Sequence, residues 1–144
     1  MSYEFYSLWD TKIEKNNKLC VFRLIGKKFG YEDYLNEIQN FTWRKELTKL
    51  RISAHKLMIE RGRYKKIDRT ERKCDICSSG ELGDEIHFVL GCKTLEHVRK
   101  ECIQESISKA KEIHGSNNEA IFKYVMTNTK MNNLAKFCWK ANTL

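Results

Sequence analysis

Three cysteines and one histidine fall within residues 74–92, and their spacing constrains the fold of this chain more than any other feature. Cys74, Cys77, His87 and Cys92 form the pattern C-x2-C-x9-H-x4-C. A C-x2-C pair can direct both thiolates to one ion from a tight turn, and a His and a Cys in the i and i+5 positions can close a tetrahedron from a short helix. The pattern therefore predicts a Cys3His site for Zn2+.

Four protein ligands leave no coordination position for water or substrate, so the predicted zinc is structural and the chain is not expected to be an enzyme. One alternative is a set of incidental thiols beside an ordinary histidine. Another is a redox C-x-x-C motif, which is disfavoured because no βαβ pattern surrounds it and Asp75 offers nothing to lower a thiol pKa. His97 also lies close enough in sequence to replace one ligand.

The six cysteines are expected to be reduced thiols or metal ligands. Residues 1–10 lack the basic and apolar regions of a secretory signal, so an intracellular, nuclear or cytoplasmic location is expected. A disulfide framework stays open as the alternative. Cys20, Cys102 and Cys138 lie on apolar stripes and are expected to be buried core thiols.

Strong chain breakers are scarce, because the 144 residues include no proline and only 7 glycines. This favours one mainly α domain, a small helical domain with an embedded Cys3His zinc-binding unit. No apolar run reaches the roughly 18–20 residues of a membrane span, so no membrane partner is expected. The expected parts are N-terminal helices (1–43), a basic helix with an extended tail (44–73), the zinc unit (74–92) and C-terminal helices (93–144).

Apolar residues at spacings of three and four predict the N-terminal helices. The first covers residues 5–13, with Ser2 as a possible N-cap and an end at residues 16–17. The second continues from Leu19 to Gly30, although residues 20–25 also fit a short strand. A further helical turn covers residues 34–38.

A longer apolar stripe runs from Trp43 through Leu57 and Met58 in a 4-3-4-3 rhythm. It predicts a single helix that reaches Arg61 and stops at Gly62, followed by an extended segment at residues 63–69. On such a helix Lys45, Lys49 and Lys56 would lie opposite the apolar stripe.

The C-terminal part predicts three more helices. Thr94 can cap a helix over residues 95–113 that closes at Gly115. Asn117 or Asn118 can cap the next helix, which carries apolar residues 121–126, and Thr129 can open the last one, over residues 131–139. We expect these helices to be core scaffold.

The positive charge of the chain is concentrated in one segment. The net charge is +8, and residues 44–73, with 12 basic and 4 acidic side chains, supply all of it because both flanks are neutral. A concentrated basic stretch is typical of a surface that binds phosphate groups. The alternative is a solvated helix face that only keeps the protein in solution.

The charge pattern predicts a nucleic-acid-binding module for RNA or DNA, with phosphate contacts and little sequence readout. Tyr64 is available to stack on an unpaired base. The expected phosphate contacts are Lys45, Lys49, Lys56, Arg61, Arg63, Lys65 and Lys66.

The segments 50–64, 69–77 and 84–92 together resemble a known arrangement, a basic helix with an I-E-x-G-R-Y ending before a C-x2-C…H-x4-C unit. The chain resembles the zinc-binding segment downstream of the polymerase in non-LTR retrotransposon reverse-transcriptase polyproteins. The resemblance implies that the four residues of the pattern bind zinc, that the module holds RNA or DNA, and that a reverse transcriptase polypeptide is a possible partner. The chain has neither an aromatic-x-Asp-Asp polymerase motif nor a Pro-Asp nuclease motif.

Two other functions remain open. The chain could be a protein-interaction adaptor with a purely structural zinc site, which exposed Phe41, Phe88 or Trp139 would support. A metal nuclease using Asp84 and Glu85 is disfavoured, because adjacent residues of a helix point about 100° apart. These two acids are more simply expected to cap the helix that bears His87 or to orient its ring nitrogen.

Overall fold

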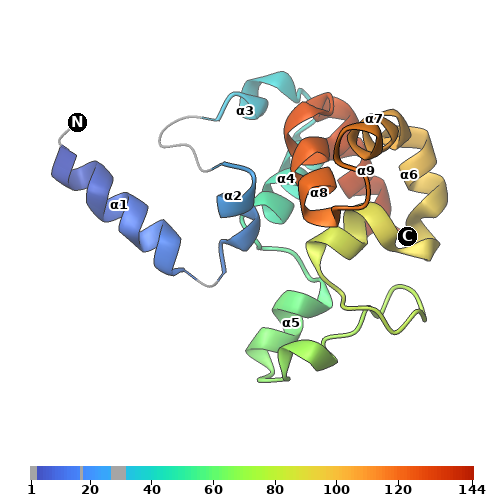
Figure 1. The fold of residues 1–144 in the computed structure, drawn as a ribbon. Helices are drawn as coiled ribbons and strands as arrows, with labels where there is room; N and C mark the ends of the chain where they lie inside the picture. Colours follow the sequence, from blue (N-terminus) through green and yellow to red (C-terminus); the bar gives the residue numbers. More distant parts are fainter. Residues whose placement is uncertain (1–2, 17, 27–31) are drawn as a thin grey trace.

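The computed structural model describes residues 3–16, 18–26 and 32–144, and its regular elements are helices (Figure 1). A single bridge between Lys73 and Leu82 is the one β-type pairing in this part of the chain. The mainly α fold class is therefore confirmed. The α-helices are α1 (Tyr3–Lys15), α2 (Cys20–Leu24), α3 (Tyr34–Glu37), α4 (Phe41–Arg51), α5 (Met58–Tyr64), α6 (Glu96–Cys102), α7 (Gln104–His114), α8 (Asn118–Asn128) and α9 (Met131–Asn142). The 3-10 helices η1 (Arg69–Glu71) and η3 (Lys93–Leu95) and the π-helical turn η2 (His87–Gly91) complete the set.

The core lies in the upper lobe of Figure 1, where α9 packs against α4 and α6 while α7 packs against α8. Leu47 from α4 and Phe137 from α9 are fully buried there. Phe88 of η2 joins the same core, with its ring centroid 5.5 Å from that of Phe137. The turn that carries His87 is thus anchored by its own apolar neighbour.

A smaller lower lobe consists of α5, η1 and the loop of residues 72–83 (Figure 1). Three backbone hydrogen bonds hold it together: Ile59 N donates to Gly83 O (3.0 Å), Gly83 N to Arg72 O (2.8 Å) and Cys74 N to Glu81 O (2.8 Å). A Cβ on Gly83 would come within 2.9 Å of the Cys74 Cα, so this close approach requires glycine.

The first two helices differ in how they pack. The predicted helix over residues 5–13 is confirmed as α1, which has no buried residue and lies to one side in Figure 1. The predicted second helix ends at Leu24, and the strand alternative for residues 20–25 is wrong, because Cys20–Leu24 is helical. Ser2, Asn17 and residues 29–30 lie outside the described residues.

The predicted single helix from Trp43 to Arg61 is wrong, since it is broken at residues 52–57 into α4 and α5. Ser53 is buried there with a φ of 59°, a conformation that ends a helix. The His55 ring occupies the break: its Nδ1 accepts a hydrogen bond from Leu57 N (3.2 Å), and its Nε2 lies 2.8 Å from Glu85 Oε1. A long-range contact therefore overrides the local helical pattern.

Gly62 does not stop the helix but lies inside α5, where a Cβ would come within 2.5 Å of the Arg72 Cγ. The extended tail predicted at residues 63–69 is also wrong. Helix α5 continues to Tyr64, Lys66 turns the chain with a φ of 58°, and η1 follows.

The C-terminal helices follow the prediction more closely. Asn117 caps α8, its side chain accepting from Ala120 N at 3.1 Å. The helix expected over residues 95–113 is divided at Ile103 into α6 and α7. Thr94 does not cap it but donates its hydroxyl to Ile76 O (3.1 Å), and α9 begins after Lys130 rather than at Thr129.

The six cysteines form no disulfide. Cys138 is buried as expected and Cys102 is half-buried, but Cys20 is exposed, so its assignment as a core thiol is wrong. None of the helices within residues 3–16, 18–26 and 32–144 has both the length and the apolar character that a membrane crossing requires.

The packing of Phe137 gives a test of the core. We expect Phe137→Ala to lower the unfolding free energy of the metal-loaded protein by about 3–5 kcal/mol, because it leaves a cavity between α9 and η2. Urea denaturation followed by circular dichroism measures the change. Ile113→Ala is the control, since this side chain is 63% exposed, and we expect it to change stability by less than about 0.5 kcal/mol. Equal effects of the two substitutions would contradict this account of the core.

Candidate metal centre

The structure brings together the four residues that the spacing singled out. The ligand atoms of Cys74, Cys77, His87 and Cys92 all lie within 4.8 Å of one another, and they form the one such group found in the described part of the chain. Ligand atoms of a tetrahedral zinc ion lie about 2.0–2.3 Å from the metal, so the distances between these atoms are shorter than 4.8 Å. The four side chains can hold a metal ion. His97, the alternative ligand, is not part of the group.

Two local structures position the ligands. Cys74 and Cys77 lie on the loop after η1, where Cys74 N donates to Glu81 O at 2.8 Å and doubles the loop back. His87 and Cys92 flank the π-helical turn η2, which closes with a 2.7 Å hydrogen bond from Cys92 N to His87 O. This i to i+5 bond brings the two residues to the same side of the turn.

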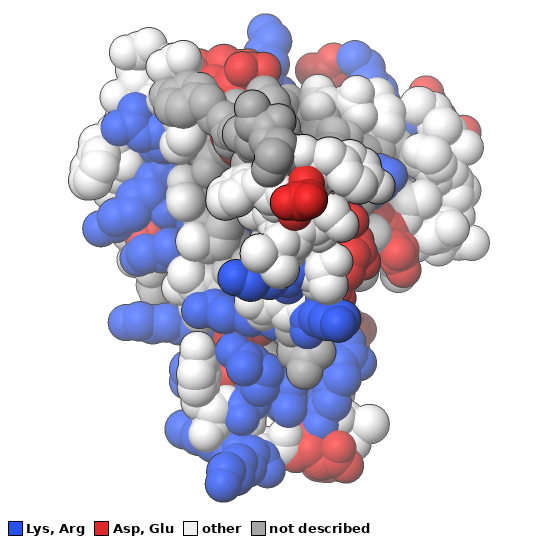
Figure 2. Space-filling model, turned by 90° about the vertical axis from the view of Figure 1, so that its left-hand side faces the viewer, with Lys and Arg blue, Asp and Glu red and all other residues white. Residues whose placement is uncertain are grey.

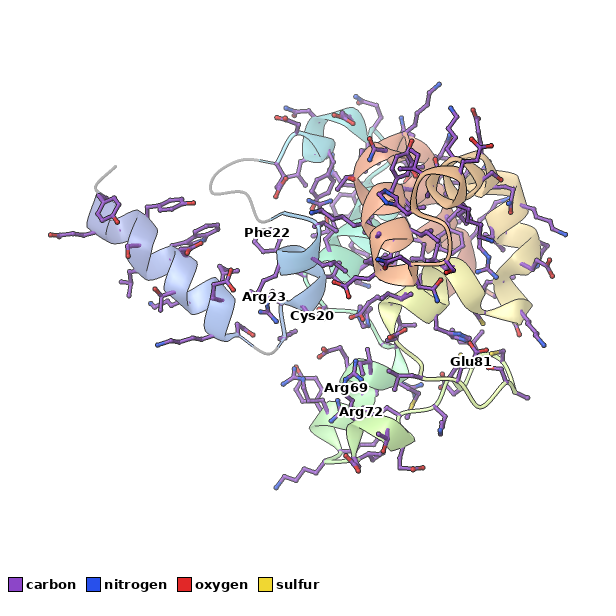
Figure 3. All side chains as sticks on the ribbon, viewed as in Figure 1. Cys20, Phe22, Arg23, Arg69, Arg72 and Glu81 are labelled. Atoms are coloured by element: carbon purple, nitrogen blue, oxygen red, sulfur yellow. The ribbon has the colours of Figure 1, made fainter. Side chains whose placement is uncertain are left out.

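Glu81 fixes the orientation of the His87 ring, with its Oε2 2.8 Å from His87 Nδ1 (Glu81 is labelled in Figure 3). A carboxylate accepts hydrogen bonds, so Nδ1 carries the proton. The unprotonated Nε2 then faces the other ligands, 3.3 Å from Cys77 Sγ. This is the arrangement in which a histidine presents a lone pair to a metal while an outer carboxylate holds its ring.

The sequence predicts that Asp84 and Glu85 cap the helix that bears His87 or orient its ring nitrogen. Asp84 does act as the expected cap, since its Oδ1 accepts from His87 N at 2.8 Å. Glu85 instead turns to His55, and neither acid holds the His87 ring. Glu81 was missed because its role depends on how the loop between Cys77 and His87 folds back.

The thiols of the centre differ in acidity. Hydrogen bonds from the Ser79 hydroxyl and the Ser79 backbone N–H lower the pKa of Cys77 to about 6, and burial opposes this shift. Burial, together with the neighbouring Cys77 and Cys74, raises the pKa of Cys92 to about 11. Without a metal Cys77 is therefore available as a thiolate at neutral pH, whereas an incoming ion must displace the proton of Cys92.

A buried arginine lies behind the ligands. Arg99 of α6 is 6% exposed and donates to the carbonyl oxygens of Phe88 and Val89 (3.4 Å each) and of Cys92. Burial lowers its pKa, whereas the nearby Cys92 opposes that shift. Three thiolates around a divalent ion carry one net negative charge, and the Arg99 guanidinium is placed to offset it.

The predicted phosphate-binding residues do not all lie on one helix face, because Lys45 belongs to α4, Lys56 to the break, and Arg61, Arg63 and Tyr64 to α5. Three of the cations are paired: Lys49 with Glu46 (3.2 Å), Arg63 with Glu60 (3.0 Å) and Arg61 with Asp75. The exposed members without such an ion pair in the described structure are Lys45, Lys56, Lys65 and Lys66. Figure 2 shows Lys and Arg over much of the face of the lower lobe that is turned to the viewer.

The aromatic residues named for an adaptor function lie in different environments. Phe41 is 65% exposed, whereas Phe88 is buried. Trp139 is half-buried and packs against Trp43, with 6.3 Å between the ring centroids. Only Phe41 of the three is available to a partner in this structure.

The chain matches no protein-family model, no curated protein and no solved structure. The resemblance to the retrotransposon segment therefore rests on the motifs of the sequence alone and stays a hypothesis.

Removing the metal tests the centre as a whole. We expect one metal ion per chain after purification without added metal, and a lower melting temperature after chelation, because the loop of residues 72–83 has little packing of its own. Elemental analysis and a thermal melt measure the two quantities. Cys77→Ser should lower both the metal content and the melting temperature. Cys138→Ser should keep the metal, because Cys138 lies outside the group. If Cys77→Ser retained a full metal content, the ligand set would be wrong.

The Glu81 contact gives a second test. We expect Glu81→Gln to weaken metal affinity by about 10–100-fold, because the amide no longer fixes the His87 tautomer as a carboxylate does. Competition with a chromogenic chelator measures the affinity. Glu71→Gln in η1 removes the same charge from an exposed position and should leave the affinity unchanged. Equal loss in both variants would assign the effect to net charge rather than to the histidine.

Proposed function

We propose that the protein is a zinc-stabilised nucleic-acid-binding module that lacks catalytic activity. The observation that carries the proposal is that the candidate metal centre closes the same lobe that bears the basic side chains (Figures 1 and 2). Binding would be dominated by phosphate contacts with RNA or DNA, and sequence readout is not expected.

The donor set supports zinc as the ion. Three thiolates and one imidazole suit zinc, and a closed set of four ligands is typical of structural sites. With no open position on the ion, Asp84 capping η2 and Glu85 held by His55, no group of this centre is left to activate water.

Hydrogen bonds within the lower lobe connect the candidate metal centre to α5 and to the turn that carries Lys65 and Lys66. Ile59 N bonds to Gly83 O between the ligand pairs, and Arg72, two residues before Cys74, donates to Ile59 O (3.1 Å) and Ile67 O (3.0 Å). Metal binding at one end of the loop thereby fixes α5 and the turn that carries Lys65 and Lys66. Tyr64, 68% exposed, is available there to stack on an unpaired base.

The sequence resemblance to the segment downstream of a retrotransposon polymerase supports the same function. It suggests that the module acts beside a reverse transcriptase polypeptide, within an intracellular compartment that holds nucleic acid. Both are parts of the proposal that a binding assay with such a polypeptide would test.

A protein-interaction adaptor is the second candidate, favoured by exposed apolar side chains. Phe41 at the start of α4, and Tyr3 and Leu8 on α1, are more than half exposed. In that case the metal would serve only to hold the fold, and the cations would be a solvated surface.

Charge reversal separates the two candidates. We expect Lys56→Glu with Lys65→Glu to weaken nucleic-acid binding by about tenfold or more, because two phosphate contacts become repulsions. Wild-type affinity should also fall with salt, with a log–log slope of about −0.7 to −0.9 per contact. Fluorescence anisotropy with labelled RNA and DNA measures both.

The control reverses the same amount of charge elsewhere. Lys100→Glu with Lys109→Glu changes exposed cations of α6 and α7, outside residues 44–73, and should retain most of the affinity. Absence of wild-type binding at low salt would reject the proposed function and leave the adaptor.

A further inference from the structure

A cleft of about 950 Å3 separates α2 from the lower lobe. Arg23 and Cys20 lie on the α2 side, and Arg69 and Arg72 face them from the lower lobe, as labelled in Figure 3. The volume of the cleft is at the upper end of the range of about 300–1,000 Å3 that is typical of ligand sites. Arg23 lies outside residues 44–73, so the sequence had not pointed to this wall.

Three guanidinium groups of the cleft form no ion pair within 4.0 Å in the described structure, although Asp84 lies close enough to Arg69 to interact with its charge. Arg23 donates to the carbonyl oxygens of Ile13 (2.9 Å) and Asn16, and Arg72 to those of Ile59 and Ile67. Carbonyl groups orient these side chains without cancelling their charge. Arg69 is exposed and has no ion pair within the described residues.

Carboxylates also line the cleft, and two of them lie deep within it. Glu60 and Glu85 are each 4% exposed, and they pair with Arg63 (3.0 Å) and His55 (2.8 Å). Glu14, Asp84 and Glu119 complete the acidic lining. Figure 2, viewed from the left-hand side of Figure 1, shows Lys and Arg at the junction of the two lobes and Asp and Glu beside them on the right.

This mixture of charges selects among nucleic-acid forms. Guanidinium groups bind phosphate, whereas carboxylates repel it but accept hydrogen bonds from the amino groups of bases. A duplex presents phosphates outward and hides the pairing edges of its bases. A single strand offers both the phosphates and the free base edges at once.

We infer that this cleft binds single-stranded nucleic acid, with Arg23, Arg69 and Arg72 on the phosphates and the exposed carboxylate of Glu119 on base amino groups. The inference rests on the proposed function and names the surface and the strand form. Tyr64, outside the cleft beside Arg63 (4.7 Å from its guanidinium to the ring centroid), extends the path of the strand.

The first test uses labelled single-stranded oligocytidylate, as RNA and as DNA, with the zinc-loaded chain in fluorescence anisotropy. We expect Arg23→Glu with Arg69→Glu to weaken binding by about tenfold, and a cytidine–guanosine duplex to bind more weakly than the single strand. Lys100→Glu with Lys109→Glu, which carries the same change in net charge on α6 and α7, is the matched control.

A second readout does not depend on a variant that folds. Cys20 is exposed on the cleft wall. A bound strand should therefore slow the alkylation of its thiol by a bulky maleimide. Mass spectrometry of the peptides measures the rate of this alkylation. Although Cys20 as a whole is exposed, its Sγ is partly buried and lies 4.0 Å from Glu85 Oε1. Both effects raise the pKa of Cys20, so the reaction is run above neutral pH. The half-buried Cys102 of α6 is outside the cleft and serves as the internal control.

The outcomes separate the inference from the proposed function. If oligocytidylate binds, but neither the double variant nor Cys20 protection responds, the strand lies elsewhere and the cleft assignment is overturned. If Lys56→Glu with Lys65→Glu then removes the binding, the proposed function still holds. If the wild-type protein binds neither single strand nor duplex at low salt, both fail.

Discussion

The Cys3His group, which can hold a metal ion, is the feature on which the lower lobe depends. Residues 72–83 include Ser78, Ser79 and Gly80 and contribute no large side chain to the fully buried core. Backbone hydrogen bonds alone contribute little net stability to such an exposed loop. Ile76 and Leu82 are only partly buried against the core. An ion held by Cys74, Cys77, His87 and Cys92 would add a cross-link between the loop and η2, which Phe88 anchors in the core.

Two charged side chains, Glu81 and Arg99, lie beside the ligands of the centre. Glu81 adds negative charge to His87 and makes its Nε2 a better donor to the metal, and Arg99 supplies positive charge behind Cys92. The two effects are compatible because they act on different ligands, Glu81 on His87 and Arg99 beside Cys92. Arg99 is buried without a carboxylate partner in the described structure, which is costly unless a negative centre lies nearby.

The sequence was sufficient where structure follows from local spacing. The ligand set follows from the C-x2-C…H-x4-C pattern, α8 from Asn117 and its apolar residues, and the helical class from the absence of proline. The sequence was not sufficient where contacts between residues far apart in the chain determine the structure. The break at residues 52–57 depends on His55 meeting Glu85, and the orientation of His87 depends on Glu81, so neither follows from helical periodicity.

The break between α4 and α5 also divides the basic segment between two bodies. Lys45 belongs to the helical core, whereas Lys65 and Lys66 belong to the lobe that the metal closes. Under the proposed function, the two groups of cations on a fixed lobe would act as a preorganised bivalent surface, in which binding at one group raises the effective concentration at the other. A loosened lobe would leave two weak, independent sites. The proposed function therefore implies that avidity for a polyanion would depend on the rigidity of the junction between the lobes as well as on the number of charges.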